Sequence, residues 1–242
     1  MIAPTIAIDG HVLNETFRIS DIRRPFPSVE PIMVSVPGRH GQVCVGEEVG
    51  TREVSFRVWS FAHDSATRMT EMAALLELLL TGSHELTFED EPDTIRDVRL
   101  SGQPDFDEYE KRGSVELTFV MPDPYRRYAT PKTVAFTTSQ TAFTLDHANP
   151  RLVIDASNVK RRTNDDLWQL TFDAEQELSV EVPTPLAAVM RIDCQTGVVT
   201  VDGARSNIIN ESVWPVLAAG RHTVQVTAGS SATTLTITER CI

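Results

Sequence analysis

The sequence predicts a mainly β protein with two domains, an α+β domain over residues 1–130 and an all-β domain over residues 131–242. Apolar and polar residues alternate along most of the chain, which is the period of half-buried strands. Only one stretch, at about residues 65–80, has the apolar spacing of a helix. A proline-rich stretch, "VMPDPYRRYATPK" at 120–132, separates the mixed part from the part made of strands alone.

Two clearly alternating strands are predicted for the sheet of the first domain, "REVSFRVWSF" and "GSVELTFVM". Shorter strands at 32–36, 86–88 and 98–100 are expected to complete this sheet. The residues expected on its buried face are Val54, Phe56 and Val58 in the first strand and Val115, Leu117 and Phe119 in the second.

The single helix is expected to pack on this sheet through a continuous apolar stripe. Asp64 or Ser65 can accept hydrogen bonds from its first amide groups, and Gly82 stands where a helix end favours a left-handed residue. Leu75 and Leu78 lie beside the stripe and indicate a second contact, such as one with another subunit. The predicted stripe consists of Met69, Met72, Ala73, Leu76, Leu79 and Leu80.

The first domain is predicted to end in the proline-rich stretch. Pro122 and Pro124 cannot donate to a ladder of hydrogen bonds, so the strand before them must end there or lie at an edge. Pro131 then stiffens a short connector. These three prolines place the domain boundary near residue 130.

The second domain is predicted to be a sandwich or jelly roll, because seven or eight short strands follow one another without a helical period. Residues 195–197 are the best turn candidate and would join 190–194 to 198–201 as a hairpin. The predicted strands lie at about 133–138, 142–146, 151–157, 167–173, 177–183, 187–203, 222–227 and 234–240.

Composition argues against nucleic-acid binding and membrane insertion. The net charge is −12, and residues 1–130 carry 13 Lys and Arg against 22 Asp and Glu, a net charge of −9. Such a surface repels phosphate backbones. No apolar run approaches the roughly 20 residues that cross a bilayer, and no secretory signal begins the chain. We therefore expect synthesis in a cytosol.

No motif predicts catalysis, a metal site or a bound cofactor. Phosphate-loop, nucleophile-elbow, HExxH and CxxC motifs are missing, and the three cysteines are far apart. The acidic clusters at 88–93 and 105–110 could in principle hold a hard cation. They follow no known calcium-loop spacing, so solvated turns or an acidic wall are the favoured interpretation. The protein is not expected to be an enzyme.

Two features remain open between a structural and a functional interpretation. The glycine-rich segment 36–54 is either a mobile surface loop or an arm that orders against a partner, and Val43, Cys44 and Val45 favour the arm. Trp168 and Trp214 could form a platform on which a sugar stacks, or they could be buried core residues.

The order of these parts resembles the distal tail protein family of long-tailed bacteriophages and prophages. The matching pieces are "VPGRHG", "REVSFRVWSF", the helix "ATRMTEMAALLELLL", "HELTFEDEPDTIRDVRLSG" and "GSVELTFVMPDPYRRYA". The most specific piece is the strand that ends in Asp123, Pro124 and Tyr125. The second half is similar to the galectin-like β-sandwich that many of these proteins carry, through "MRIDCQTGVVTVDGARSNI" and the strands after it.

The resemblance implies a structural protein of the virion tail tip, made in the cytoplasm of a bacterial host. Its N-terminal domains would close a ring, usually of six copies, around a channel that an acidic lining keeps from binding DNA. Pro37, Gly38, Arg39 and Gly41 match the family's subunit-contact loop. The implied partners are other copies of the chain, the tail tube protein, the tape-measure protein, the tail-associated tip protein and a receptor-binding protein.

Three hypotheses follow. The preferred one is a baseplate hub that joins the tail tube to the tip and docks receptor-binding or tail-fibre proteins. The alternative is a carbohydrate-binding β-sandwich protein of an adhesion device, with Trp168 or Trp214 stacking on the sugar. A cell-wall hydrolase would need a convergent acid/base or metal site, and the sequence offers none.

Overall fold

Strands dominate the computed structural model, which describes residues 4–109, 111–163, 166–208 and 212–241. The mainly β class is therefore confirmed. The chain divides into two compact units, which we call unit 1, within residues 1–127, and unit 2, Tyr128–Cys241. Each unit has its own cluster of buried apolar side chains.

Unit 1 is an antiparallel sheet with one α-helix, α1 (Ser65–Leu79), and a 3-10 turn, η1 (Leu13–Glu15). Its strands are β1 (Ile6–Ile8), β2 (His11–Val12), β3 (Arg18–Arg23), β4 (Val29–Ser35), β5 (Gln42–Val49), β6 (Arg52–Ser60), β7 (His84–Phe88), β8 (Glu91–Ser101), β9 (Phe106–Tyr109), β10 (Arg112–Met121) and β11 (Arg126–Tyr128), the last at the junction with unit 2. The main sheet has the order β2-β1-β7-β8-β10-β6-β3, and β9 pairs with β10.

The two predicted alternating strands, β6 and β10, lie side by side with their apolar residues in register. Val54 faces Phe119, Phe56 faces Leu117 and Val58 faces Val115, so that all six side chains are buried on one face. The Phe56 and Phe119 rings stack with their centroids 5.5 Å apart. The predicted strands at 86–88 and 98–100 belong to β7 and β8 of the same sheet.

Helix α1 begins and ends as predicted, but it buries a different face. The Asp64 carboxylate accepts a hydrogen bond from the Thr67 amide over 2.8 Å, and Gly82 is left-handed with φ +93°. Met72, Leu75 and Leu79 enter the core, whereas Met69 is 51% exposed and Leu80 is 67% exposed. The apolar residues extend around much of the helix, so their spacing alone did not select the buried stripe. Leu75, expected beside the predicted stripe, is in the middle of the face that the helix buries.

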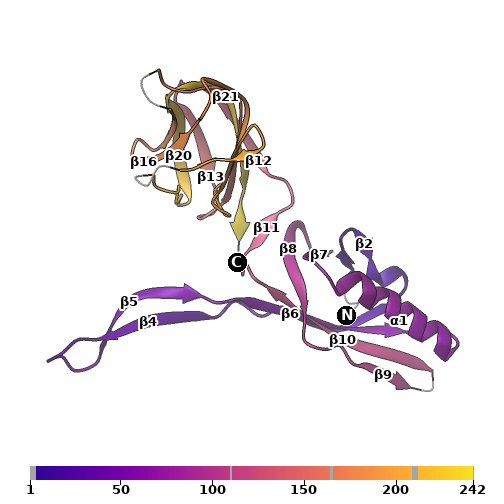
Figure 1. Cartoon of the computed structure of the whole chain (residues 1–242). Helices are drawn as coiled ribbons and strands as arrows, with labels where there is room; N and C mark the ends of the chain where they lie inside the picture. The colour runs from indigo at the N-terminus through magenta and orange to yellow at the C-terminus, as the bar shows by residue number, and fades with distance from the viewer. Residues whose placement is uncertain (1–3, 110, 164–165, 209–211, 242) are drawn as a thin grey trace. The chain divides into compact units, whose positions relative to one another are not determined.

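Residues 32–36 do not join the main sheet. They belong to β4 and the turn after it, and β4 pairs with β5 in a separate two-stranded sheet. The segment 36–54, interpreted as either a mobile surface loop or an arm, is thus mostly regular, with β5 and the start of β6 inside it. Figure 1 shows β4 and β5 as a long ribbon that continues beyond the end of β6.

Unit 2 is a sandwich of two antiparallel sheets. One has the order β12-β21-β14-β17-β18-β19 and the other β13-β20-β15-β16. Met190–Asp193 pairs with Val198–Val201 across the turn at 195–197, as predicted. The strands are β12 (Lys132–Phe136), β13 (Thr141–Leu145), β14 (Arg151–Lys160), β15 (Leu167–Phe172), β16 (Gln176–Glu181), β17 (Leu186–Asp193), β18 (Val198–Val201), β19 (Ala204–Arg205), β20 (Gly220–Ala228), β21 (Ser230–Thr238) and β22 (Arg240–Cys241).

Candidate assembly site

An exposed hairpin is the most conspicuous surface feature of unit 1. We call it the arm: residues 29–49, made of β4, the turn at 36–41 and β5. Every residue of β4 is exposed, and those of β5 are exposed or half-buried. At about 3.3 Å per residue, the seven residues of β4 span roughly 23 Å. An isolated two-stranded hairpin is at best marginally stable in water, so such an arm needs a further surface.

The arm carries apolar side chains on both of its faces. A β-bulge interrupts the pairing of β4 with β5 between Ile32 and Met33. Val29 and Val49 face each other on one side of the ribbon, and the pair Met33–Cys44 beyond the bulge lies on the same side. Ile32, Val34 and Val43 lie on the other side. Val45, at the bulge, is 62% exposed. A run of exposed apolar residues with polar neighbours is typical of an interaction surface.

The charged residues of the arm are segregated along its length. Glu30 and Glu48 are directly opposite each other near its root, and Glu47 lies on the other face, opposite Pro31. Like charges at opposed positions destabilise a pair of strands. Among the described residues none of the three glutamates has an ion pair. Arg39 and His40 stand at the tip.

The predicted subunit-contact residues all lie in the turn at the tip of the arm. Gly38 and Gly41 have φ of +81° and +85°, which favours glycine at both positions, and the Arg39 amide donates to the Val36 carbonyl over 3.2 Å. Pro37 lies within the turn, directly before Gly38. The structure therefore brings the four residues together at the tip of a regular hairpin.

A second surface feature lies at the opposite end of β6 from the arm. We call it the Trp59 groove, a hollow of about 230 Å³ lined by Arg18, Ser20, Trp59, Phe61 and Arg112. Arg18 is the cross-strand partner of Trp59, whose indole N–H donates to the Ser20 hydroxyl over 2.8 Å. The Arg112 guanidinium lies 4.7 Å from the Trp59 ring and 5.3 Å from the Tyr109 ring.

The Trp59 groove was not among the sites predicted from the sequence. The signal was present in "REVSFRVWSF", where Trp59 and Phe61 occupy the positions that alternate with the buried residues. An alternating strand should expose polar residues there. Two aromatic residues on the outward face, one of them 52% exposed, therefore indicate a contact surface.

The segment Asp123–Tyr125 lies near the end of unit 1, between β10 and β11. The ladder of β10 stops at Met121, immediately before Pro122, as the prolines predict. The Asp123 carboxylate accepts a hydrogen bond from the Tyr125 amide over 3.2 Å, so the segment forms an Asx turn. Its conformation accounts for its role at the end of the strand.

Each acidic cluster has carboxylates in ion pairs, while other members, such as Asp93 and Asp105, are exposed to solvent. Glu91 contacts the buried Arg96, and it pairs with Arg126 over 2.6 Å. These contacts lower the pKa of Glu91 although its burial opposes them. In the second cluster Glu108 pairs with Arg68, and Glu110 lies outside the described residues. Within the described part of the chain, no group of three His, Cys, Asp or Glu is arranged to hold a metal ion.

The two tryptophans proposed for sugar stacking have different surroundings. Trp168 is 0% exposed, and its indole N–H donates to the Ser231 hydroxyl over 3.1 Å in the core of unit 2. An enclosed ring has no face left for a sugar, so for Trp168 the core interpretation holds. Trp214 is half-buried and lines a pocket of about 290 Å³.

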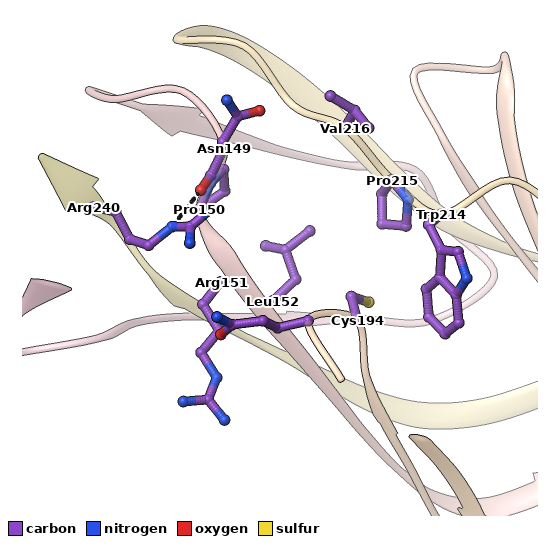
Figure 2. A pocket seen from close by; sticks show the side chains of 10 residues that line it. Asn149, Pro150, Arg151, Leu152, Cys194, Trp214, Pro215, Val216 and Arg240 are labelled. Carbon is purple, nitrogen blue, oxygen red and sulfur yellow. Dashed lines mark hydrogen bonds between the residues drawn. The ribbon is translucent and has the colours of Figure 1, made fainter. Parts of the chain in front are cut away.

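Figure 2 shows the pocket of Trp214. The Arg240 guanidinium donates to the Asn149 carbonyl over 2.7 Å, and Arg151 pairs with Asp193 over 3.2 Å. Burial raises the pKa of the Cys194 thiol to about 12, and Asp193 adds to this effect, so the thiol stays protonated and unreactive. The lining residues are Asn149, Pro150, Arg151, Leu152, Cys194, Gln195, Trp214, Pro215, Val216 and Arg240.

Among the residues described, no helix has the length and apolar composition that a membrane span requires.

Comparison with known proteins covers both units. Residues 9–121 match the family model of the phage tail protein RIFT-related domain, and residues 127–240 match that of the siphovirus-type tail component, C-terminal domain. No curated protein matches the sequence.

Solved structures share the fold at low sequence identity. The Dit protein (gp 19.1) of phage SPP1, described as a paradigm of the hub adsorption apparatus in phages that infect Gram-positive bacteria, superposes with a TM-score of 0.73 at 19% identity over 99% of both chains. A chain of the phage P2 baseplate in its activated conformation with Ca gives 0.58 at 9% identity, over 100% of this chain and 99% of that one. The form with Sr gives 0.58 at 9% identity over 98% of both.

Proposed function

The chain belongs to the distal tail protein family of siphophages, and from this premise we propose that it is the hub of a tail tip, built as a ring of six copies. The role is structural, without turnover of a substrate. Unit 1 forms the ring, and unit 2 docks receptor-binding or tail-fibre proteins. The tail tube, tape-measure and tail-associated tip proteins are the other partners, and the ring belongs to the virion tail.

The arm is the observation that carries this proposal. It exposes valines, an isoleucine and a methionine on a hairpin that pairs with no other strand of the described residues. A monomer gains nothing from exposing these side chains, because their burial supplies most of the free energy of association. Pro37, Gly38, Arg39 and Gly41 shape the tip that reaches the neighbouring copy. The arm thus supports self-assembly through unit 1.

The net negative charge of residues 1–130 fits a ring through which DNA passes. A channel with a negative lining keeps phosphate backbones from adhering, whereas a basic lining would bind them in a strongly salt-dependent way. No base-specific contact is needed for this role.

Removal of the arm tests the proposal. The Gly50 amide donates to the Ser28 carbonyl over 2.9 Å, so the root is closed independently of the arm, and residues 29–49 can be replaced by an Asn-Gly turn. We expect the full chain to form six-fold particles with a central hole in negative-stain images, with the matching mass by light scattering. The shortened variant should be a folded monomer.

Two results would contradict the ring. One is a full-length chain that stays monomeric at every concentration up to its solubility limit. The other is an armless variant that forms the same particles as the full chain. Equal near-ultraviolet circular dichroism of the two proteins, after allowance for the deleted residues, shows that the shortened chain is folded.

A second candidate function belongs to the pocket of Trp214. An aromatic ring and the amide side chains of Asn149 and Gln195 line one cavity, which is the combination that stacks on a sugar ring and hydrogen-bonds its hydroxyl groups. We propose that this pocket holds a neutral glycan. On a glycan array the full chain should bind, and Trp214→Ala should lose binding while the control Met69→Ala, an exposed position of α1, keeps it. A wild-type chain that binds no glycan rules this function out.

A further inference from the structure

Two arginine side chains give the Trp59 groove a cationic lining. Neither Arg18 nor Arg112 has an ion pair among the described residues, although Arg57 beside them pairs with Glu116 over 3.0 Å. Phe61 completes the groove with an exposed ring. Tryptophan and arginine, enriched at the energetic centres of protein interfaces, are both present in this groove.

The arm has the complementary surface. On one face Glu30 and Glu48 stand opposite each other, neither of them paired with a cationic side chain of the described residues, and Ile32 and Val34 follow on the same face. Two carboxylates held together in this way repel each other, and two guanidinium groups would relieve that repulsion. Ile32 and Val34, which lie beyond the two glutamates, offer apolar surface that can pack against the rings of Trp59 and Phe61.

We propose that the Glu30–Glu48 face of the arm docks into the Trp59 groove of a second copy of this chain. The inference rests on the proposed self-assembly and names the surface that receives the arm. Burial of Ile32 and Val34 against the aromatic rings supplies the attraction, and pairing of the glutamates with Arg18 and Arg112 fixes the register.

The positions of the two surfaces in unit 1 favour a ring over a two-fold dimer. The arm continues from β6 at Arg52, whereas Trp59 lies near the other end of this nine-residue strand, about 23 Å away at roughly 3.3 Å per residue. Figure 1 shows the arm beyond one end of the sheet and β9, the neighbour of the groove, at the other. Different surfaces at opposite ends make a head-to-tail contact, and such contacts produce rings when the rotation closes.

Charge exchange between two variants tests the docking. The first variant carries Glu30→Arg and Glu48→Arg, and the second carries Arg18→Glu and Arg112→Glu. Each alone should be monomeric by light scattering, because like charges meet at every contact. An equimolar mixture should recover rings, since each arm then meets a groove of opposite charge. A six-membered ring accommodates the two variants in alternation.

Glu47→Arg is the matched control, because Glu47 lies on the opposite face of the same arm. It should assemble like the wild type, and all variants should keep the wild-type near-ultraviolet circular dichroism. A reversed variant that assembles alone, or a mixture that stays monomeric, would overturn the docking while the ring of the wild type stands. A wild-type chain that is monomeric at all concentrations would overturn the ring and the docking together.

Discussion

At the scale of single residues, one histidine stabilises unit 2 through its charge. Nδ1 of His222 contacts the Asp173 carboxylate at 2.6 Å, and Nε2 contacts the Ala218 carbonyl at 2.8 Å. Because both ring nitrogens face acceptors, the protonated form satisfies both contacts. Burial lowers the pKa of His222, but the hydrogen bonds to Asp173 and Ala218 outweigh it and raise the pKa above 6.5. The pKa of Asp173 is lowered by His222 and Thr223 against the effect of its own burial.

The first prediction is that His222→Gln destabilises the protein in a pH-dependent way. A raised histidine pKa contributes stability that is complete below the unfolded value near 6.5 and is lost as pH rises through the folded value. Chemical denaturation should therefore show a loss of about 1–2 kcal/mol near pH 5.5 and a smaller loss near pH 9. His40→Gln, at the arm tip, is the control. Equal losses at the two pH values would contradict the charged pair.

At the scale of elements, α1 shows how tertiary contacts choose among apolar residues. Met69 and Met72 are adjacent members of the stripe predicted from spacing, yet Met72 is 1% exposed and packs in the core. The Arg68 guanidinium, also buried, donates to the Ala62 carbonyl over 3.0 Å and pairs with Glu108 over 3.3 Å. These contacts anchor the first turns and hold the helix in the rotation that faces Met72 inward.

The second prediction uses these two methionines as a matched pair. Met72→Ala removes a buried side chain and should lower the free energy of unfolding by about 2–4 kcal/mol. Met69→Ala makes the same chemical change on the exposed side and should change it by less than about 0.5 kcal/mol. Urea unfolding of both variants measures the difference. Similar losses at the two positions would mean that the helix presents the stripe expected from sequence.

At the scale of the whole molecule, the two units have separate cores. The core of unit 2 draws on strands from both sheets of the sandwich and includes Trp168, Phe172 and Ile192, while that of unit 1 includes Phe56, Phe119 and Met72. A chain of about 110 residues can bury enough surface to fold alone. Unit 2 therefore has the hydrophobic core that an independently folding domain requires.

The third prediction is that residues 128–242 fold when produced alone. The fragment contains Trp168 and Trp214, so Trp214→Phe leaves the buried Trp168 as the sole tryptophan. Its emission should be blue-shifted and should move to the red in one cooperative urea transition. Red-shifted emission without denaturant would show that the fragment depends on the rest of the chain.

The sequence predicted the secondary-structure elements more reliably than the contacts that these elements make. Alternation in β6 and β10 predicted which side chains are buried, because in a strand that choice depends only on neighbouring positions. Val43, Cys44 and Val45 favoured an arm that orders against a partner, but the pairing of β4 with β5 was not predicted. Glycines at 38, 41, 46 and 50 indicated flexibility, although two of them serve a turn and the others lie in or beside β5.

The sequence by itself determined the mainly β class, the position of the helix, the strands of the sandwich and the end of β10 at Pro122, because periodicity, capping residues and prolines act over a few positions. Only the tertiary structure decided which face α1 buries, that β4 leaves the main sheet for the arm, and that Trp168 is enclosed while Trp59 lies in a groove. Those outcomes depend on contacts between segments far apart in the chain, such as Arg18 opposite Trp59, and local pattern carries no information about them.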